Sequence, residues 1–95
     1  MPIYLAIPLI ADSSALNSSV STNITEVDRH KLQAERGWLI KFDYTSIELS
    51  NHLGITWQAP GISSPVGPSM VTPISSYYGR GPNDMWEWLK TRFEQ

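Results

Sequence analysis

Hydrophobic and polar positions along the chain predict seven elements, the first of them a strand over residues 3–8. Apolar side chains fall on both of its faces: Ile3, Leu5 and Ile7 on one, and Tyr4 and Ala6 on the other. A strand that is apolar on both faces is typical of the middle of a sheet covered on both sides. Pro8 has no N–H for a neighbouring strand, so regular pairing should end there.

Residues 11–25 are rich in Ser, Thr and Asn, which favour turns and helix caps. Leu16, Val20 and Ile24 nevertheless recur at every fourth position and form one stripe of a helix. Asp12 or Ser13 is suited to cap it. We predict a short helix over 13–22, with a mobile loop as the alternative because helix propensity here is low.

A β-hairpin is predicted next, with strands over 27–33 and 38–44. The turn between them contains Gly37, which a tight connection favours. The first strand is polar enough for a sheet edge, whereas the second is strongly apolar and should be central. One face of the second strand carries Trp38, Ile40, Phe42 and Tyr44.

Thr45 and Glu48 form a capping box, which predicts a helix over 46–53 ending at Gly54. Its apolar face is expected to hold Ile47, Leu49 and Leu53. The Pro- and Gly-rich segment 56–69 is predicted to be an irregular loop, either functional or mobile.

The last two elements are a strand over 70–78 and a helix that begins near Pro82. Pro73 lies in the middle of the strand and therefore predicts an edge position. The helix is expected to bury a stripe of Met85, Trp86, Leu89 and Phe93.

This order predicts a single α+β domain over 1–95 with the ferredoxin-like β-α-β-β-α-β arrangement. That arrangement is a four-stranded antiparallel sheet with two helices on one face. Its first and third strands are central, and its second and fourth strands lie at the edges, which agrees with the apolar and polar runs. The additional C-terminal helix should lie across the sheet or extend a dimer contact.

Composition narrows the possible chemistry. The 95 residues include no cysteine, which excludes disulfides, thiolate zinc sites and thiol catalysis. His30 and His52 have no metal-ligand spacing and are expected to be solvated polar residues, and the acids are scattered. We therefore predict no metal, no cofactor and no catalytic residue. The longest apolar run is too short to cross a bilayer and lacks the flank of a signal peptide, which predicts a cytoplasmic protein.

Residues 79–83 read Gly-Arg-Gly-Pro-Asn and lie between a predicted strand and a predicted helix. Free N–H groups at a helix start favour an anion, so Tyr77, Tyr78 and Arg80 are candidate ligand-binding residues for a phosphate or carboxylate. The purely geometric use of Gly and Pro in such a connection is the alternative.

Two of the four tryptophans do not fit the predicted core. Trp57 lies in the Pro-rich loop, and Trp88 lies off the main stripe of the last helix. Exposed tryptophans often anchor interfaces, so both are candidate interface residues for self-association or a protein partner.

Three segments together resemble a known group of proteins: 38–43 (Trp-Leu-Ile-Lys-Phe-Asp), 77–79 (Tyr-Tyr-Gly) and 88–90 (Trp-Leu-Lys). They resemble small bacterial proteins of the SinR-like group. Those are similar to the nuclease-like subunit of CRISPR spacer acquisition, which is a ferredoxin-like homodimer. In that subunit, an Asp at the end of strand one is tied to metal-dependent nuclease activity. Here residues 7–10 read Ile-Pro-Leu-Ile, without an acid. The resemblance thus implies the fold and the dimer but not the nuclease activity.

The leading hypothesis is a non-catalytic, homodimeric protein-interaction module, which the resemblance places in a bacterial mobile-element or defence setting. The alternatives are a small enzyme or anion- or nucleotide-binding protein that uses the 79–83 turn, and a nucleic-acid binder. A net charge of −2 argues against the last, because acids balance the basic residues of the hairpin. Those basic residues are Arg29, Lys31, Arg36 and Lys41.

Overall fold

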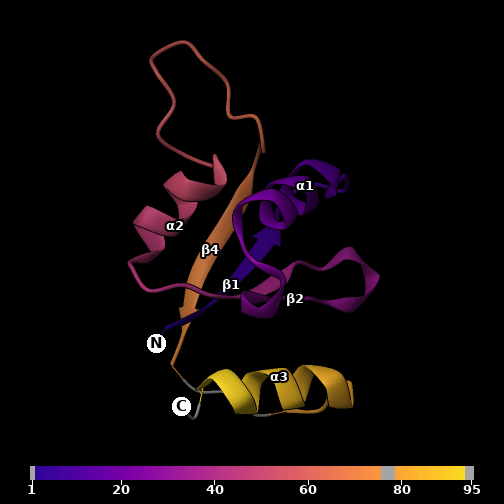
Figure 1. The fold of residues 1–95 in the computed structure, drawn as a ribbon. Helices are drawn as coiled ribbons and strands as arrows, with labels where there is room; N and C mark the ends of the chain where they lie inside the picture. Colours follow the sequence, from indigo (N-terminus) through magenta and orange to yellow (C-terminus); the bar gives the residue numbers. More distant parts are fainter. Residues whose placement is uncertain (1, 76–78, 94–95) are drawn as a thin grey trace.

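The fold is a four-stranded antiparallel sheet with three helices, seen in the computed structural model of residues 2–75 and 79–93 (Figure 1). The strands are β1 (Ile3–Pro8), β2 (Arg29–Lys31), β3 (Trp38–Lys41) and β4 (Ser69–Ile74). The helices are α1 (Ser14–Asn23), α2 (Ser46–Leu53) and α3 (Asn83–Phe93), with short 3-10 turns η1 (Glu26–Asp28) and η2 (Gln33–Glu35).

The strand order is β2-β3-β1-β4, so β1 and β3 are central and β2 and β4 are the edges, as predicted. β1 pairs antiparallel with both neighbours: Tyr4 lies opposite Ile40 of β3 and opposite Pro73 of β4. The polar content of the run 27–33 predicted the β2 edge, and Pro73 predicted the β4 edge.

α1 and α2 cover one face of the sheet. The helix interpretation of residues 11–25 is confirmed over the loop alternative, because Leu16 and Val20 are buried and Ile24 follows them into the same core. Asp12 Oδ1 accepts a hydrogen bond of 3.0 Å from Ser14 N at the start of α1. The core on this face also contains Tyr4, Ala6, Trp38, Ile40, Leu49, Leu53 and Val66.

α2 has the predicted bounds because local signals fix both of its ends. Thr45 Oγ1 accepts a hydrogen bond of 3.2 Å from Glu48 N, and Gly54 ends the helix at φ +83°. The expected apolar face was wrong at one position: Ile47 is 72% exposed, whereas Leu49 and Leu53 are buried. Two residues turn a helix by about 200°, so Ile47 and Leu49 point in opposite directions.

α3 packs on the other face of the sheet, apart from α1 and α2 (Figure 1). Trp88 and Leu89 join Ile3 and Leu39 in a second core, which completes the covering of β1 on both sides. The expectation that Trp88 lies exposed off the main stripe is wrong, since only 9% of it is exposed. Met85 and Trp86 are partly buried against this core, and the side chain of Phe93 lies outside the described part of the chain.

The hairpin is shorter than predicted on both strands. η1 replaces the start of the expected strand 27–33, because Asp28 N bonds back to Thr25 O at 3.0 Å. β3 ends at Lys41 rather than at Tyr44. β4 covers the first part of the predicted strand 70–78, whose residues 76–78 lie outside the described residues.

Candidate functional site

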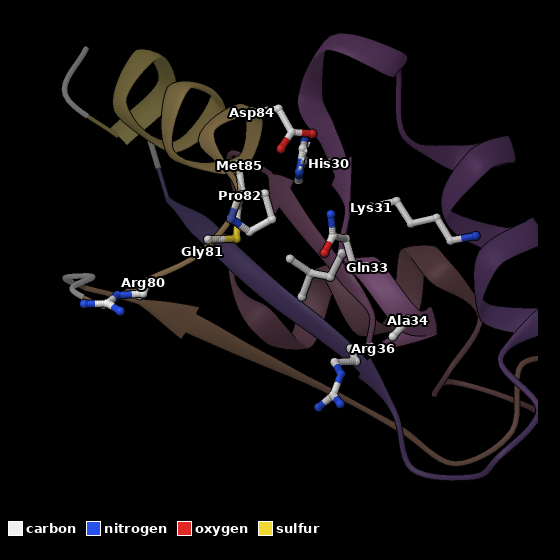
Figure 2. Close-up of a pocket in the computed structure, with 11 residues that line it drawn as sticks. His30, Lys31, Gln33, Ala34, Arg36, Arg80, Gly81, Pro82, Asp84 and Met85 are labelled. Carbon is white, nitrogen blue, oxygen red and sulfur yellow. Dashed lines mark ion pairs between the residues drawn. The ribbon is translucent and has the colours of Figure 1, made fainter.

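The predicted anion site falls partly within the described structure. Tyr77 and Tyr78 lie outside the described residues, so their candidate role stays a prediction. Arg80 is exposed and lines a groove of about 310 Å³ between the start of α3 and the β2–β3 connection (Figure 2). We call it the basic groove. It is lined by His30, Lys31, Leu32, Gln33, Ala34, Arg36, Arg80, Gly81, Pro82, Asp84 and Met85.

Charged side chains stand around the rim of the basic groove. Figure 2 shows Arg80 and Arg36 on separate sides of it, well apart from one another, and His30 next to Asp84 on a third side. Among the described residues, neither guanidinium has a hydrogen-bond or ion-pair partner. Lys31 points away from the groove (Figure 2), and its Nζ lies 3.0 Å from Glu35 Oε1. The groove therefore offers two free cations beside apolar side chains.

The turn that carries Arg36 has an unusual backbone. Ala34 and Glu35 both lie in the left-handed region, at φ 58° and 56°. Such residues cost of order 1 kcal/mol each and persist only where their surroundings hold them. Gly37 follows at φ +128°, and a Cβ there would lie 2.3 Å from Ala6 O, so the end of the turn lies directly against β1.

The Glu35 carboxylate holds this turn in place. Lys31 lies against its Oε1, while Ser13 Oγ and Asn17 Nδ2 donate to its Oε2 at 2.8 and 2.7 Å. The hydrogen bond from Lys31, followed by those from Ser13 and Asn17, lowers the pKa of Glu35 to about 2. The carboxylate thus links the turn to the start of α1 and fixes the position of Arg36.

Both histidines were expected to be solvated, and the structure differs from this expectation at His30 but not at His52. The His30 side chain is only 18% exposed; its Nε2 lies 4.0 Å from Asp84 Oδ2, and its ring centroid lies 6.0 Å from that of Trp88. His52 is exposed as expected, with Nε2 3.1 Å from Asn23 O. No group of three potential metal ligands occurs among residues 2–75 and 79–93.

Trp57 lies on a second surface, which is formed by α2, the loop after α2 and β4. It lies in the loop after α2 and is 85% exposed, as the sequence predicted. Its backbone is left-handed, at φ 76°. A hollow of about 460 Å³, which we call the Trp57 hollow, is lined by Ser46, Ile47, Ser50, Asn51, Thr56, Trp57, Ser69, Met70 and Val71.

The loop around Trp57 is irregular, as predicted, but it is tied to the domain at both ends. Gln58 Nε2 donates to Gly54 O at 3.0 Å, and Ser64 Oγ donates to the same carbonyl at 2.9 Å. Val66 is buried in the core below α1 and α2. The exposure of Trp57 is therefore set by an anchored loop, while the expected mobility of 56–69 stays a prediction.

Trp88 takes no part in an exposed surface. It is buried between α3 and the sheet, its Nε1 has no hydrogen-bond partner among the residues that the structure describes, and the Arg92 guanidinium carbon lies 4.8 Å from its ring centroid. The exposure on which the expected interface role rests is therefore present at Trp57 and absent at Trp88, and the role of Trp57 stays a prediction.

Three comparisons with known proteins give no relative for this chain. No family model matches it, and no curated protein and no solved structure is significantly similar. Within the described residues, no helix has the length and apolar content needed to cross a membrane.

Proposed function

We propose that the protein is a non-catalytic interaction module of ferredoxin-like topology that self-associates and binds a protein partner. The strand order, the antiparallel pairing and the placement of α1 and α2 on one face support this topology. α3 then adds a layer to the opposite face, across the sheet.

One observation carries the interaction role: Trp57 is 85% exposed while its backbone is held at φ 76°. A left-handed non-glycine residue costs of order 1 to 3 kcal/mol, and an exposed indole gains nothing from the hydrophobic effect. Ile47 and Met70 line the same hollow and are also exposed. An apolar group anchored in this way is typical of an interface residue.

Sedimentation velocity across a concentration series tests the proposal. The wild-type chain should shift from 10.7 kDa to a higher mass, and Trp57→Ala should weaken this association at least tenfold. Val27→Ala is the control, because Val27 is also an exposed apolar residue but lies near the opposite edge, β2. Association through apolar surface should persist when salt is raised. A wild-type chain that stays monomeric, or equal effects of the two variants, would contradict the proposal.

The basic groove supports a second candidate function, the binding of a small organic anion. Arg36 and Arg80 both line it, without partners among the described residues, together with the apolar side chains of Leu32 and Met85. A carboxylate or phosphate joined to an apolar body matches this pairing of charge and surface.

Titration calorimetry with phenyl phosphate and with benzoate tests this second function and separates the two anions. Binding should be lost in Arg36→Gln and in Arg80→Gln, and kept in Lys90→Gln, which removes an exposed cation of α3 outside the groove. No heat with either probe, or equal losses in all three variants, would exclude the groove as this site.

A further inference from the structure

We infer that β4 is the self-association surface, and that it pairs antiparallel with β4 of a second copy about a two-fold axis at Val71. This inference rests on the proposed self-association and names its geometry. It follows from which backbone groups of β4 are free, from where its proline lies, and from the hollow beside it.

The free backbone groups follow from the register. Leu9 N donates to Pro68 O at 3.0 Å, directly beyond the pair Pro8–Ser69. Hydrogen-bonded and non-hydrogen-bonded pairs alternate along an antiparallel ladder. Met70 and Thr72 therefore bond to β1, whereas Ser69, Val71 and Pro73 direct their backbone groups toward the open edge.

This open edge is complementary to itself. With Val71 opposite the second copy's Val71, the two valines exchange a pair of hydrogen bonds. Ser69 then lies opposite the second copy's Pro73, so each Ser69 N–H donates to a proline carbonyl across the axis. Pro73 lacks an N–H but serves there as an acceptor, so four hydrogen bonds form in total.

Other registers use the edge less well. If Pro73 lies opposite the second copy's Val71, the valine carbonyl of each pair has no donor, because proline has no N–H. Only two hydrogen bonds then remain, one in each of the two pairs. Placing Ser69 opposite Val71 keeps four bonds but overlaps the strands over only three residues, with Pro68 and the left-handed Gly67 just beyond. The register about Val71 uses β4 from Ser69 to Pro73.

The Trp57 hollow gains an occupant in this arrangement. Val71 lies opposite Ala6, whose side chain belongs to the α1–α2 core, so Ser69 and Pro73 also face the α2 side. The second copy's Pro73 therefore approaches Ser69, which lines the hollow together with Trp57. A proline ring beside an exposed indole gives Trp57 the contact that the single chain does not provide.

Cysteine cross-linking tests the register, because the chain has no cysteine of its own. In this register, Met70 of one chain lies opposite Thr72 of the second copy. The two form a non-hydrogen-bonded pair, with Cα atoms about 4.5 Å apart, within the range of a disulfide. An equimolar mixture of Met70→Cys and Thr72→Cys should therefore cross-link at least tenfold faster than either variant alone. Two Met70 positions lie about 7 to 8 Å apart on the diagonal, too far for ready oxidation.

Amide hydrogen exchange of the wild-type protein gives a second readout without any substitution. The Ser69 and Val71 amides should exchange at least tenfold more slowly at concentrations where the protein self-associates than on dilution. The Met70 and Thr72 amides are the internal control, because they bond to β1 in both states and should not respond to dilution.

The outcomes separate this inference from the proposed function. A protein that self-associates, but cross-links fastest as Met70→Cys alone or shows no dilution effect at Ser69 and Val71, overturns the β4 pairing and leaves the interaction module standing. A protein that is monomeric at every concentration overturns both. Selective cross-linking of the mixture together with dilution-sensitive Ser69 and Val71 amides establishes the pairing.

Discussion

Asn17 and Glu35 are joined by a hydrogen bond of 2.7 Å from Asn17 Nδ2 to Glu35 Oε2, which fastens the β2–β3 connection to α1. The same amide group accepts a hydrogen bond of 2.9 Å from the buried indole of Trp38 through Asn17 Oδ1. A single polar side chain of α1 thus holds both the left-handed turn and the aromatic side chain at the start of β3.

Asn17→Ala should lower the free energy of unfolding by about 1 to 3 kcal/mol, because it leaves the buried Trp38 N–H without a partner. Asn23→Ala is the control: Asn23 is exposed at the end of α1, and its side chain bonds only to Ser19. Urea denaturation followed by tryptophan fluorescence measures both. Equal losses in the two variants would show that the Asn17–Trp38 bond contributes nothing specific.

The free energy of unfolding should fall as the pH is lowered from about 4.5 to about 2. The pKa of Glu35 is lowered from 4.5 to about 2 in the folded protein, chiefly by the hydrogen bond from Lys31, so the unfolded chain takes up its proton first. The contribution of Glu35 is complete above pH 4.5 and is lost as pH falls through this range. Glu35→Gln should flatten this part of the stability–pH curve, and Lys31→Gln should flatten it in part. A curve that is the same in wild type and Glu35→Gln would contradict the assignment.

Leu53→Ala should cost about 2 to 5 kcal/mol, because Leu53 is 2% exposed in the core beneath α2 and its truncation leaves a cavity. Ile47→Ala, on the same helix, should change stability by no more than about 0.5 kcal/mol, because Ile47 is exposed. Thermal and urea unfolding of the two variants compare the faces of α2 directly. A large loss at Ile47 would place the core on the wrong side of the helix.

Trp88→Ala should destabilise the protein by about 3 to 5 kcal/mol, because Trp88 fills the core between α3 and the sheet. Trp57→Ala should leave the stability of the monomer within about 0.5 kcal/mol of wild type, since the indole contacts solvent. The comparison is made in dilute solution, where association does not contribute. Similar losses in the two variants would mean that Trp57 has contacts within its own chain.

The elements that the sequence predicts to the residue are those with local signals at their ends. β1 ends at Pro8, which cannot continue the ladder, and α2 lies between the Thr45 cap and Gly54. The burial of Trp88 has no such signal. The expected stripe held Met85, Trp86, Leu89 and Phe93. Met85, Trp86 and Leu89 do pack against the second core, but Trp88 joins them there, which only the docking of α3 determines.

The candidate sites show the same division. Arg80 and Trp57 could be singled out from the sequence, because each lies in a Gly- or Pro-rich connection. Arg36 entered only as one basic residue of a charge-balanced hairpin, and its place in the same groove as Arg80 depends on how the β2–β3 turn and the start of α3 are placed in the fold. Two of the hydrogen bonds that hold Glu35 come from Ser13 and Asn17, at the start of α1. The pattern of apolar and polar residues in the hairpin does not reveal these contacts.

The central position of β1 has a kinetic consequence. Ile3 pairs with Lys41 on one side and with Ile74 on the other, so both neighbours of this strand lie far along the chain. The chain must lose the entropy of closing such long loops before the contacts between the strands stabilise it. Domains dominated by distant pairings therefore fold in milliseconds to seconds rather than microseconds. During synthesis, one edge of β1 stays unpaired until β4 has followed, and the face that carries Ile3 stays uncovered until α3 has followed. We therefore expect formation of the β1–β4 ladder to limit the folding rate.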